Sequence, residues 1–283
     1  MSPSVFAVSF ISSCGGPLLQ DAIRVESLTK RFGSLLAVDH LTFSCVAGST
    51  LGLLGANGAG KSTLIKMLTT LLPPSSGTAF VGGSVVVKEP AAVRRKIGYV
   101  SQMLSADGEL TGYENLLVAA KLYLIPRAVR AERIERALEF MDLGEAARRR
   151  VRQYSGGMVR RLEIAQSMLH RPAVLFLDEP SVGLDPAAKR VVWDRVKQLR
   201  EEFGTTILMT THDMEEADQL CDAIGIMHRG QLVALNSPAA LKASVGQSAT
   251  LDSVFIHFTG LTFTEGGELR DVSRTRITSH RLG

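Results

Sequence analysis

One glycine-rich stretch narrows the choice of fold more than any other part of the chain. Residues 50–54 form a short apolar run, followed by Gly55, Ala56, Asn57, Gly58, Ala59, Gly60, Lys61, Ser62 and Thr63. Leu64, Leu68 and Leu71 then recur at the spacing of a helix that stops at residues 73–74, both proline. A strand, a glycine loop and a helix in this order are the context of a phosphate-binding loop. A glycine turn that merely caps an ordinary helix is much less favoured by this spacing.

The residue types of this loop suit a phosphorylated ligand. Its three glycines let the backbone bend so that successive N–H groups point at one anion. The helix N-terminus that follows favours negative charge through its unpaired N–H groups and its dipole. By residue type, Lys61 would reach the outer phosphates and the hydroxyl of Ser62 would ligate Mg²⁺.

A second chemical signal is a pair of carboxylates at the end of a core strand. Residues 173–177 form a continuous apolar run, which is typical of a strand buried on both faces of a parallel sheet, and Asp178 and Glu179 follow it directly. Two adjacent carboxylates at such a place would each cost several kcal/mol without a partner. A metal ion and a water molecule would supply that partner: Asp178 can hold Mg²⁺ through its water shell, and Glu179 can accept a proton from an attacking water.

Two further polar residues follow predicted strands. Gln102 comes just after the strand at residues 97–100, and His212 comes at the end of the strand at residues 205–211. The carboxyl ends of strands in an open α/β sheet face the ligand crevice, so both are candidates for the site. Each signal is weak alone, because a loop Gln is usually solvated and a His beside a helix start is commonly structural.

The N-terminal part of the pattern predicts a second, smaller sheet. Residues 23–28 and 41–45 alternate like edge strands, and Phe32 lies in the turn between them. The Phe32 ring could stack on a nucleotide base or simply pack against its own turn.

The middle of the chain changes to helical periodicity. A capping box at Thr111 starts one helix, and a second follows at about residues 128–141 without an intervening strand. This break in the βα alternation indicates an inserted helical subdomain at about residues 104–156. Ser155, Gly156 and Gly157 then open the next helix, as a second anion-binding nest or as an ordinary N-cap. The arginines at positions 148–150 and 152 are more simply a solvated face than a contact to nucleotide or to an acidic partner.

Composition sets the remaining bounds. With 283 residues and 45% hydrophobic content, the chain can bury a full core. The net charge of +4 suggests acidic partners without identifying them.

Cys14, Cys45 and Cys221 show no metal or redox spacing and are expected to be buried thiols. No stretch approaches the roughly 20 apolar residues of a membrane span, so any work on a membrane would go through another chain. Residues 1–21 lack Lys and Arg, which favours a disordered leader or misassigned start over an export signal.

Taken together, the motifs between about residues 22 and 260 resemble the ATP-binding-cassette (ABC) ATPases. Residues 55–63 match the Walker A loop, Gln102 the Q-loop, residues 154–158 the signature motif and residues 174–179 the Walker B strand with its catalytic carboxylate. Residues 181–185 match the D-loop, and His212 matches the switch histidine. The signature departs from the commonest form at Tyr154 and Met158. In this it is similar to drug-resistance exporters of the daunorubicin type, and to nodulation-type and polysaccharide or lipid exporters.

The resemblance implies an α/β fold with a P-loop NTPase core of mainly parallel sheet, an N-terminal antiparallel β-subdomain and the inserted helical subdomain. It implies an ATPase domain at residues 22–240, which leaves a C-terminal extension at residues 241–283. The last residues of this extension are rich in Arg, Ser and Thr, so its end is expected to be disordered. The implied cofactors are ATP and Mg²⁺. Phe32 would stack on adenine, and residues 55 and 57–63 with Ser155, Gly156 and Gly157 would bind nucleotide. Ser62, Gln102 and Asp178 would surround Mg²⁺, and Lys61, Gln102, Glu179 and His212 would take part in hydrolysis.

The resemblance also implies partners. Ser155 and Gly157 would complete the site of a second copy, so hydrolysis needs a head-to-tail homodimer that drives a transmembrane permease subunit. The ATPase would then be cytoplasmic, on the inner face of the cell membrane through that permease. No nucleic acid is expected, although a soluble ABC-type ATPase acting on DNA or ribosomes is the alternative function. A nucleotide-gated regulator without turnover is a third reading, but it would lack the carboxylate that Glu179 supplies.

Overall fold

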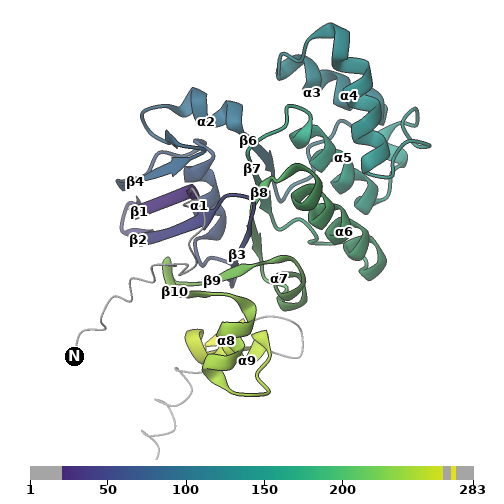
Figure 1. The fold of residues 1–283 in the computed structure, drawn as a ribbon. Helices are drawn as coiled ribbons and strands as arrows, with labels where there is room; N and C mark the ends of the chain where they lie inside the picture. Colours follow the sequence, from purple (N-terminus) through teal and green to yellow (C-terminus); the bar gives the residue numbers. More distant parts are fainter. Residues whose placement is uncertain (1–20, 264–268, 272–283) are drawn as a thin grey trace, which may run out of the picture.

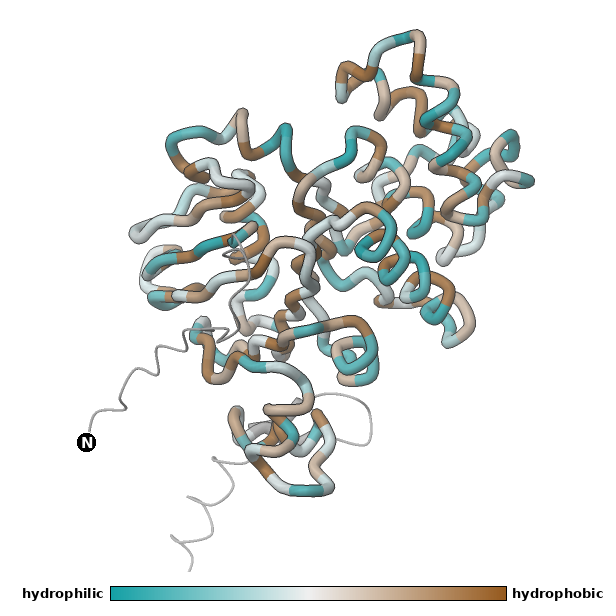
Figure 2. The backbone as a smooth tube through the Cα atoms, viewed as in Figure 1, coloured by the Kyte–Doolittle hydropathy of each residue, from teal (hydrophilic) through white to brown (hydrophobic). Residues whose placement is uncertain are grey.

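The centre of the molecule is a six-stranded, mainly parallel sheet (Figure 1). The computed structural model describes residues 21–263 and 269–271. The strands of this sheet, in the order in which they lie side by side, are β10 (Gln231–Asn236), β9 (Ala223–His228), β3 (Thr50–Gly55), β8 (Thr206–Thr211), β7 (Val174–Asp178) and β6 (Ile97–Val100). Every residue of β3, β7 and β8 is buried, as their apolar runs predict. Figure 2 shows this concentration of hydrophobic residues in the middle of the fold.

The predicted second sheet is present and antiparallel. Its strands, in spatial order, are β2 (Leu35–Val46), β1 (Asp21–Phe32), β4 (Ser76–Val81) and β5 (Ser84–Val85). β1 and β2 are longer than the alternating segments predicted for them. Register shifts interrupt their pairing, and Ser27 and His40 adopt φ values of 48° there. Such bulges break the period-two pattern, so alternation alone detects only part of each strand.

The helix after the phosphate loop lies between the two sheets. This helix, α1 (Lys61–Leu68), contacts β2 and β4 on one side and β3 and β7 on the other. The prediction that it continues to residues 73–74 is wrong. Thr70 adopts a left-handed φ of 66°, which ends the helix early and leaves Leu71 exposed at the surface.

The remaining helices surround the central sheet. They are α2 (Pro90–Lys96), α3 (Gly112–Leu122), α4 (Arg127–Phe140), the 3₁₀ turn η1 (Val151–Gln153), α5 (Gly156–Met168), α6 (Pro186–Phe203) and α7 (Met214–Leu220). The capping box at Thr111 is confirmed, because its hydroxyl accepts a bond from the Glu114 N–H and the Glu114 carboxylate accepts one from the Thr111 N–H. α3 and α4 stand far from the antiparallel sheet, as an inserted helical unit would (Figure 1).

The described C-terminal segment packs on the edge of the central sheet. α8 (Pro238–Val245) and α9 (Leu251–Thr259) contact β10, and α9 also contacts α7 and β9. A short ribbon of β11 (Leu261–Phe263) and β12 (Leu269–Asp271) follows. The predicted leader, apart from Asp21 at the start of β1, and the predicted disordered end lie largely outside the described residues.

Two of the three cysteines are described, and both are buried free thiols, as predicted. Burial raises the pKa of Cys45 to about 11 and the pKa of Cys221 well above its ordinary value. Cys14 lies outside the described residues. Within the described part of the chain, none of the helices has the length and apolar character that a bilayer span requires.

Candidate nucleotide-binding site

The phosphate loop joins β3 to α1 in the predicted strand, loop and helix order. Gly58 and Gly60 adopt φ values of 81° and 104°, which side chains rarely tolerate. A Cβ atom at Gly60 would also lie 2.4 Å from the carbonyl oxygen of Ala37. Glycine is therefore required at Gly60 by both backbone conformation and close packing against β2.

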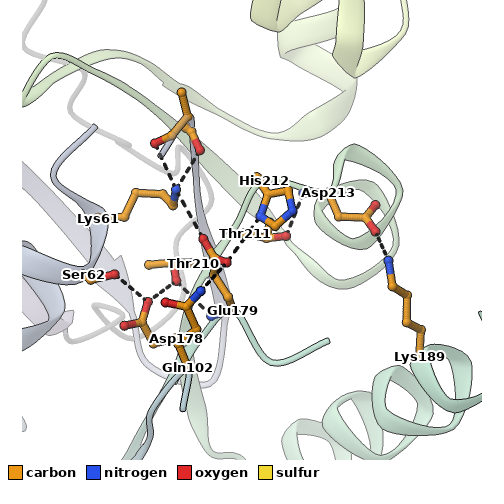
Figure 3. A network of polar contacts seen from close by, with 12 residues as sticks. Lys61, Ser62, Gln102, Asp178, Glu179, Lys189, Thr210, Thr211, His212 and Asp213 are labelled. Atoms are coloured by element: carbon orange, nitrogen blue, oxygen red, sulfur yellow. Dashed lines mark hydrogen bonds and ion pairs between the residues drawn. The ribbon is translucent and has the colours of Figure 1, made fainter. Parts of the chain in front are cut away.

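Lys61 lies at the centre of the site (Figure 3). Its Nζ donates to the carbonyl oxygens of Gly55 at 2.7 Å and Ala56 at 3.2 Å, and it lies 3.6 Å from Glu179 Oε1. The side chain is 4% exposed, and this burial lowers the pKa of Lys61. The buried amine therefore links the phosphate loop directly to the carboxylate pair.

The Asp178 carboxylate is held by two hydroxyl groups. Thr210 Oγ1 donates to Asp178 Oδ1 at 2.6 Å, and Ser62 Oγ donates to the same oxygen at 3.1 Å. Thr210 reaches this position because β7 and β8 are parallel neighbours with Asp178 opposite Thr210. The sequence reading assigned no role to Thr210. The available signal was that two core strands end in polar residues, but their relative register cannot be read from either strand alone.

Glu179 receives three partners at the end of β7. His212 Nδ1 lies 3.4 Å from Glu179 Oε2, Gln102 Nε2 donates to the same oxygen at 3.2 Å, and Lys61 approaches the other oxygen. The hydrogen bond with His212 is the main cause that lowers the pKa of Glu179, with the Lys61 charge acting in the same direction and burial opposing both. The same contact raises the pKa of His212.

The backbone of Glu179 is strained. It adopts a φ of 51°, in the left-handed region that residues with a side chain seldom occupy. The Glu179 N–H is fixed by bonds to the carbonyl oxygen and the hydroxyl of Thr210. Such strain persists where the surroundings enforce it and is concentrated at functional sites.

Of these groups, Lys61, Ser62, Gln102 and Glu179 line a cavity of about 700 Å³. It is lined by the phosphate loop, by the β1–β2 turn and by Gln102 and Glu179, the full set being Phe32, Leu35, Leu36, Ala37, Asn57, Gly58, Ala59, Gly60, Lys61, Ser62, Thr63, Gln102, Glu179, Arg229 and Gly230. Phe32 is 47% exposed on this wall rather than packed away. Arg229 and Gly230, on the β9–β10 turn, are lining residues that the sequence reading did not single out.

Ser155, Gly156 and Gly157 are not among the lining residues of this cavity. Ser155 caps α5, with its hydroxyl accepting a bond from the Met158 N–H at 3.3 Å. A Cβ atom at Gly157 would lie 2.8 Å from Ala188 Cβ, so this glycine allows α5 to pack closely on α6. Within one chain these residues therefore have local capping and packing roles.

The arginines at positions 148–150 and 152 are exposed to solvent, as the sequence favours. The guanidinium of Arg148 stacks over the Tyr113 ring at 4.4 Å. Arg150 and Arg152 both pair with the exposed Glu109. No group of three or more His, Cys, Asp or Glu side chains within the described ranges could hold a metal ion. A divalent ion at Ser62 and Asp178 would therefore need further oxygen ligands from nucleotide or water.

A glycine loop at a helix start, joined through a buried lysine to a carboxylate pair on a parallel strand, defines a P-loop nucleotide hydrolase. Residues 38–182 match the family model described as ABC transporter. The chain therefore belongs to the ABC transporter family, and it is an ATP-hydrolysing enzyme.

Several relatives extend this assignment over most of the chain. "Daunorubicin resistance ATP-binding protein DrrA3" of Streptomyces coeruleorubidus is 44% identical over 225 residues, 80% of this chain and 71% of the relative. "Linearmycin resistance ATP-binding protein LnrL" of Bacillus subtilis is 39% identical over 79% of this chain and 72% of the relative. "Nod factor export ATP-binding protein I" of Ralstonia nicotianae is 40% identical over 77% and 68%. The resemblance to daunorubicin-type and nodulation-type proteins is thus confirmed.

Solved structures agree with the fold. One, described as the ATP-binding subunit of an ABC transporter, has a TM-score of 0.74 at 28% identity, covering 84% of this chain and 99% of that chain. Another, an ATP-binding cassette of an ABC transporter in its ADP conformation, has a TM-score of 0.72 at 25% identity over the same shares. The predicted fold class is confirmed.

Proposed function

We propose that this chain is the ATP-hydrolysing subunit of an exporter and drives a separate transmembrane permease subunit. The observation that carries the proposal is one network of contacts at the cavity (Figure 3): Lys61, Ser62 and Glu179 line it, Asp178 is bonded to Ser62, and His212 lies against Glu179. The relatives named above are resistance and export proteins, which favours an exporter of drug-like or lipid-like molecules over an ATPase acting on DNA or ribosomes. The subunit would work in the cytoplasm, on the inner face of the membrane.

Different residues of the chain would bind different parts of the nucleotide. Phe32 would stack on the adenine ring, because its aromatic side chain is exposed on the cavity wall. The N–H groups of residues 57–63 and the Lys61 amine would bind the phosphates. Ser62 and Asp178 present oxygen ligands whose nearest pair is 3.1 Å apart, which suits Mg²⁺. Gln102 would add a third ligand, and nucleotide and water oxygens would complete the set. Bound there, Mg²⁺ would neutralise phosphate charge during hydrolysis.

Glu179 would act as the general base. Its lowered pKa keeps the carboxylate ionised at neutral pH, as a proton acceptor must be. Gln102 and His212 both contact Glu179 Oε2 and hold the carboxylate at the cavity edge. His212 is 50% exposed beside Glu179 and would contact the γ-phosphate.

Residues 155–157 would complete the site of a second copy in a two-fold, head-to-tail homodimer. Two observations support this assignment. The start of α5, with a Ser cap and two glycines, is suited to bind an anion, and these residues do not line the cavity of their own chain. Each dimer would then hold two nucleotides, and hydrolysis would release the two copies.

The permease would dock beside the Gln102 loop. Met103 and Leu104, directly after Gln102, are 81% and 54% exposed. On the helical insert, Leu122 and Leu124 are 77% and 85% exposed. Large apolar side chains exposed to this extent, next to a residue of the site, suit a partner that senses nucleotide.

The substitution Glu179→Gln tests the catalytic assignment. We expect it to lower ATP turnover by roughly 10² or more, because a positioned general base contributes about 10² to 10⁴. ATP affinity, measured by calorimetric titration, should stay close to that of the unmodified chain. Unchanged turnover in Glu179→Gln would remove Glu179 from this role.

The same variant tests the dimer. Glu179→Gln should form a dimer with ATP in size-exclusion chromatography with light scattering, and Ser155→Arg added to it should keep ATP binding but lose the dimer. A dimer that survives Ser155→Arg would exclude residues 155–157 from the interface. Affinity capture from the membranes of the source cell, followed by mass spectrometry, should identify a permease; recovery of ribosomal or DNA-bound partners instead would favour the alternative function.

A further inference from the structure

A buried ion pair on α5 lies apart from the residues discussed so far. Arg160 and Glu163 are one helical turn apart, with side chains only 2% and 4% exposed, and Arg160 Nη1 lies 3.1 Å from Glu163 Oε2. Burying two charges costs several kcal/mol per ion, and an apolar pair of the same volume is often at least as stable. Stability of α5 alone therefore does not explain why charges stand here.

Both charges bind the loop that carries Gln102. Arg160 donates from Nη1 to the carbonyl oxygen of Ser101 at 2.6 Å and from Nη2 to that of Gln102 at 2.8 Å. Glu163 Oε1 accepts a bond from the backbone N–H of Ser105 and another from the Ser105 hydroxyl, the latter at 3.1 Å. The ion pair thus fixes both ends of residues 101–105, and Gln102 belongs to the end that Arg160 binds.

Besides these contacts, the Ser101 hydroxyl donates to the carbonyl oxygen of Met103 at 2.7 Å, and Gln102 donates to Glu179 at 3.2 Å. Gln102, Met103, Leu104 and Ser105 are all exposed, so apolar packing contributes little to their position. A charge-assisted hydrogen bond is roughly twice as strong as a neutral one. The contacts from α5 therefore determine where this loop lies.

The position of the loop matters at the carboxylate. Gln102 Nε2 lies 3.2 Å from Glu179 Oε2, so the backbone bond from Arg160 and the side-chain bond to Glu179 are made by the same residue. Ser155 caps α5 about two turns before Glu163. One buried pair thus connects the helix of residues 155–157 to the hydrolytic group.

We propose that Arg160 and Glu163 are positioning residues for ATP hydrolysis. They fasten residues 101–105 to α5, so that Gln102 stays at Glu179 and moves whenever α5 moves. Contact of a second copy with the start of α5 is thereby transmitted to the carboxylate. The inference rests on the role proposed above for Gln102.

A double-mutant cycle on the full-length chain tests the proposal. Arg160→Lys keeps the charge but removes the two-armed contact to Ser101 and Gln102. Because a small misplacement at a reacting group can cost a large factor in rate, we expect kcat to fall about tenfold while KM for ATP changes less than about threefold. The matched control is Arg161→Lys: Arg161, the next residue, binds the carbonyl oxygens of Met141 and Asp142 instead, and its kcat should stay within about twofold.

The second variant of the cycle is Gln102→Ala, in which the effect of Arg160→Lys is measured again. If Arg160 acts through Gln102, adding Arg160→Lys to Gln102→Ala should lower kcat by less than about twofold further. An equal loss in both backgrounds would overturn the proposal, since a purely structural role predicts it. If Gln102→Ala lowers kcat and Arg160→Lys does not, this inference alone fails. If Gln102→Ala itself has no effect, the role proposed for Gln102 fails with it.

A second measurement does not depend on activity or on Arg160→Lys folding. Glu163→Gln keeps the shape of the side chain but removes its charge, so amide hydrogen exchange at Ser105 should become about fivefold faster, the difference expected between charged and neutral acceptors. Exchange in residues 55–63 should not change. Unaltered exchange at Ser105 would overturn the proposal.

Discussion

Thr210→Val is a sharp test of how the carboxylate strand is held. The substitution keeps the branched shape of the side chain in a fully buried position and removes only the hydroxyl. That hydroxyl donates to Asp178 Oδ1 at 2.6 Å and accepts a bond from the Glu179 N–H at 3.0 Å. The variant therefore removes one hydrogen bond from Asp178 and one from Glu179 without changing either residue.

The size of the effect follows from the two bonds. A hydrogen bond to a charged group contributes about 1.5 to 3 kcal/mol, and Asp178 keeps only the weaker, 3.1 Å bond from Ser62. The loss at Glu179 is smaller, because its N–H also reaches the Thr210 carbonyl oxygen at 3.1 Å. The added valine methyl offsets part of this, so the free energy of unfolding should fall by about 2 kcal/mol.

Thermal and urea unfolding of the full chain would measure this change. For a chain of this size about 2 kcal/mol corresponds to a fall in Tm of roughly 4 to 8 °C. Thr206→Val is the matched control on the same strand: the Thr206 hydroxyl accepts a bond from the uncharged Gly48 N–H at 2.9 Å, so the loss should be about 1 kcal/mol. Equal losses in the two variants, or no loss in Thr210→Val, would refute the argument that charge on Asp178 sets the magnitude.

Three further predictions follow from other contacts of the site. Lys61→Ala should weaken ATP binding at least about tenfold in calorimetric titration, since it removes a buried charge-assisted donor; native affinity would contradict this. Because Glu179 raises the pKa of His212, their pairing stabilises the fold below the ordinary His pKa of 6.5, and this contribution is lost as the pH rises through the raised value. We expect less than about 1 kcal/mol, because the imidazole is half exposed, and His212→Ala should abolish the pH dependence of unfolding that it causes. Trp193→Phe should cost about 1 to 3 kcal/mol in the same assay, because it leaves the buried Glu216 without the indole donor at 2.9 Å; an unchanged midpoint would show that Glu216 is satisfied otherwise.

The parts of the site that could be predicted are those written in consecutive residues. Residues 55–63 specify strand, loop and helix in one continuous stretch, and Asp178 with Glu179 follows its strand without a gap. Gln102 and His212 could be proposed because each follows an apolar run that ends at the same edge of a parallel sheet. In the structure, Glu179 and Gln102 line the same cavity as the phosphate loop, and His212 lies against Glu179.

The parts that could not be predicted depend on register and on burial of polar groups. Thr210 acts on Asp178 only because β7 and β8 pair with these two residues opposite each other. Thr210 also accepts a bond from the Glu179 N–H, although the two residues lie 31 positions apart in the sequence. Arg160 and Glu163 stand in a run of charges that is typical of a solvated helix face. Their burial becomes visible only when the loop at residues 101–105 is in place against α5.

The strand order also bears on how the protein is made. β8 lies between β3, which carries the phosphate loop, and β7, which carries the carboxylates, yet it is the last of the three to be translated. A nascent chain that has emerged from the ribosome only as far as residue 200 holds both halves of the site on strands that have no direct pairing with each other. We infer that the growing polypeptide cannot bind ATP until β8 has paired between them, so nucleotide binding should mark the joining of these three strands during synthesis.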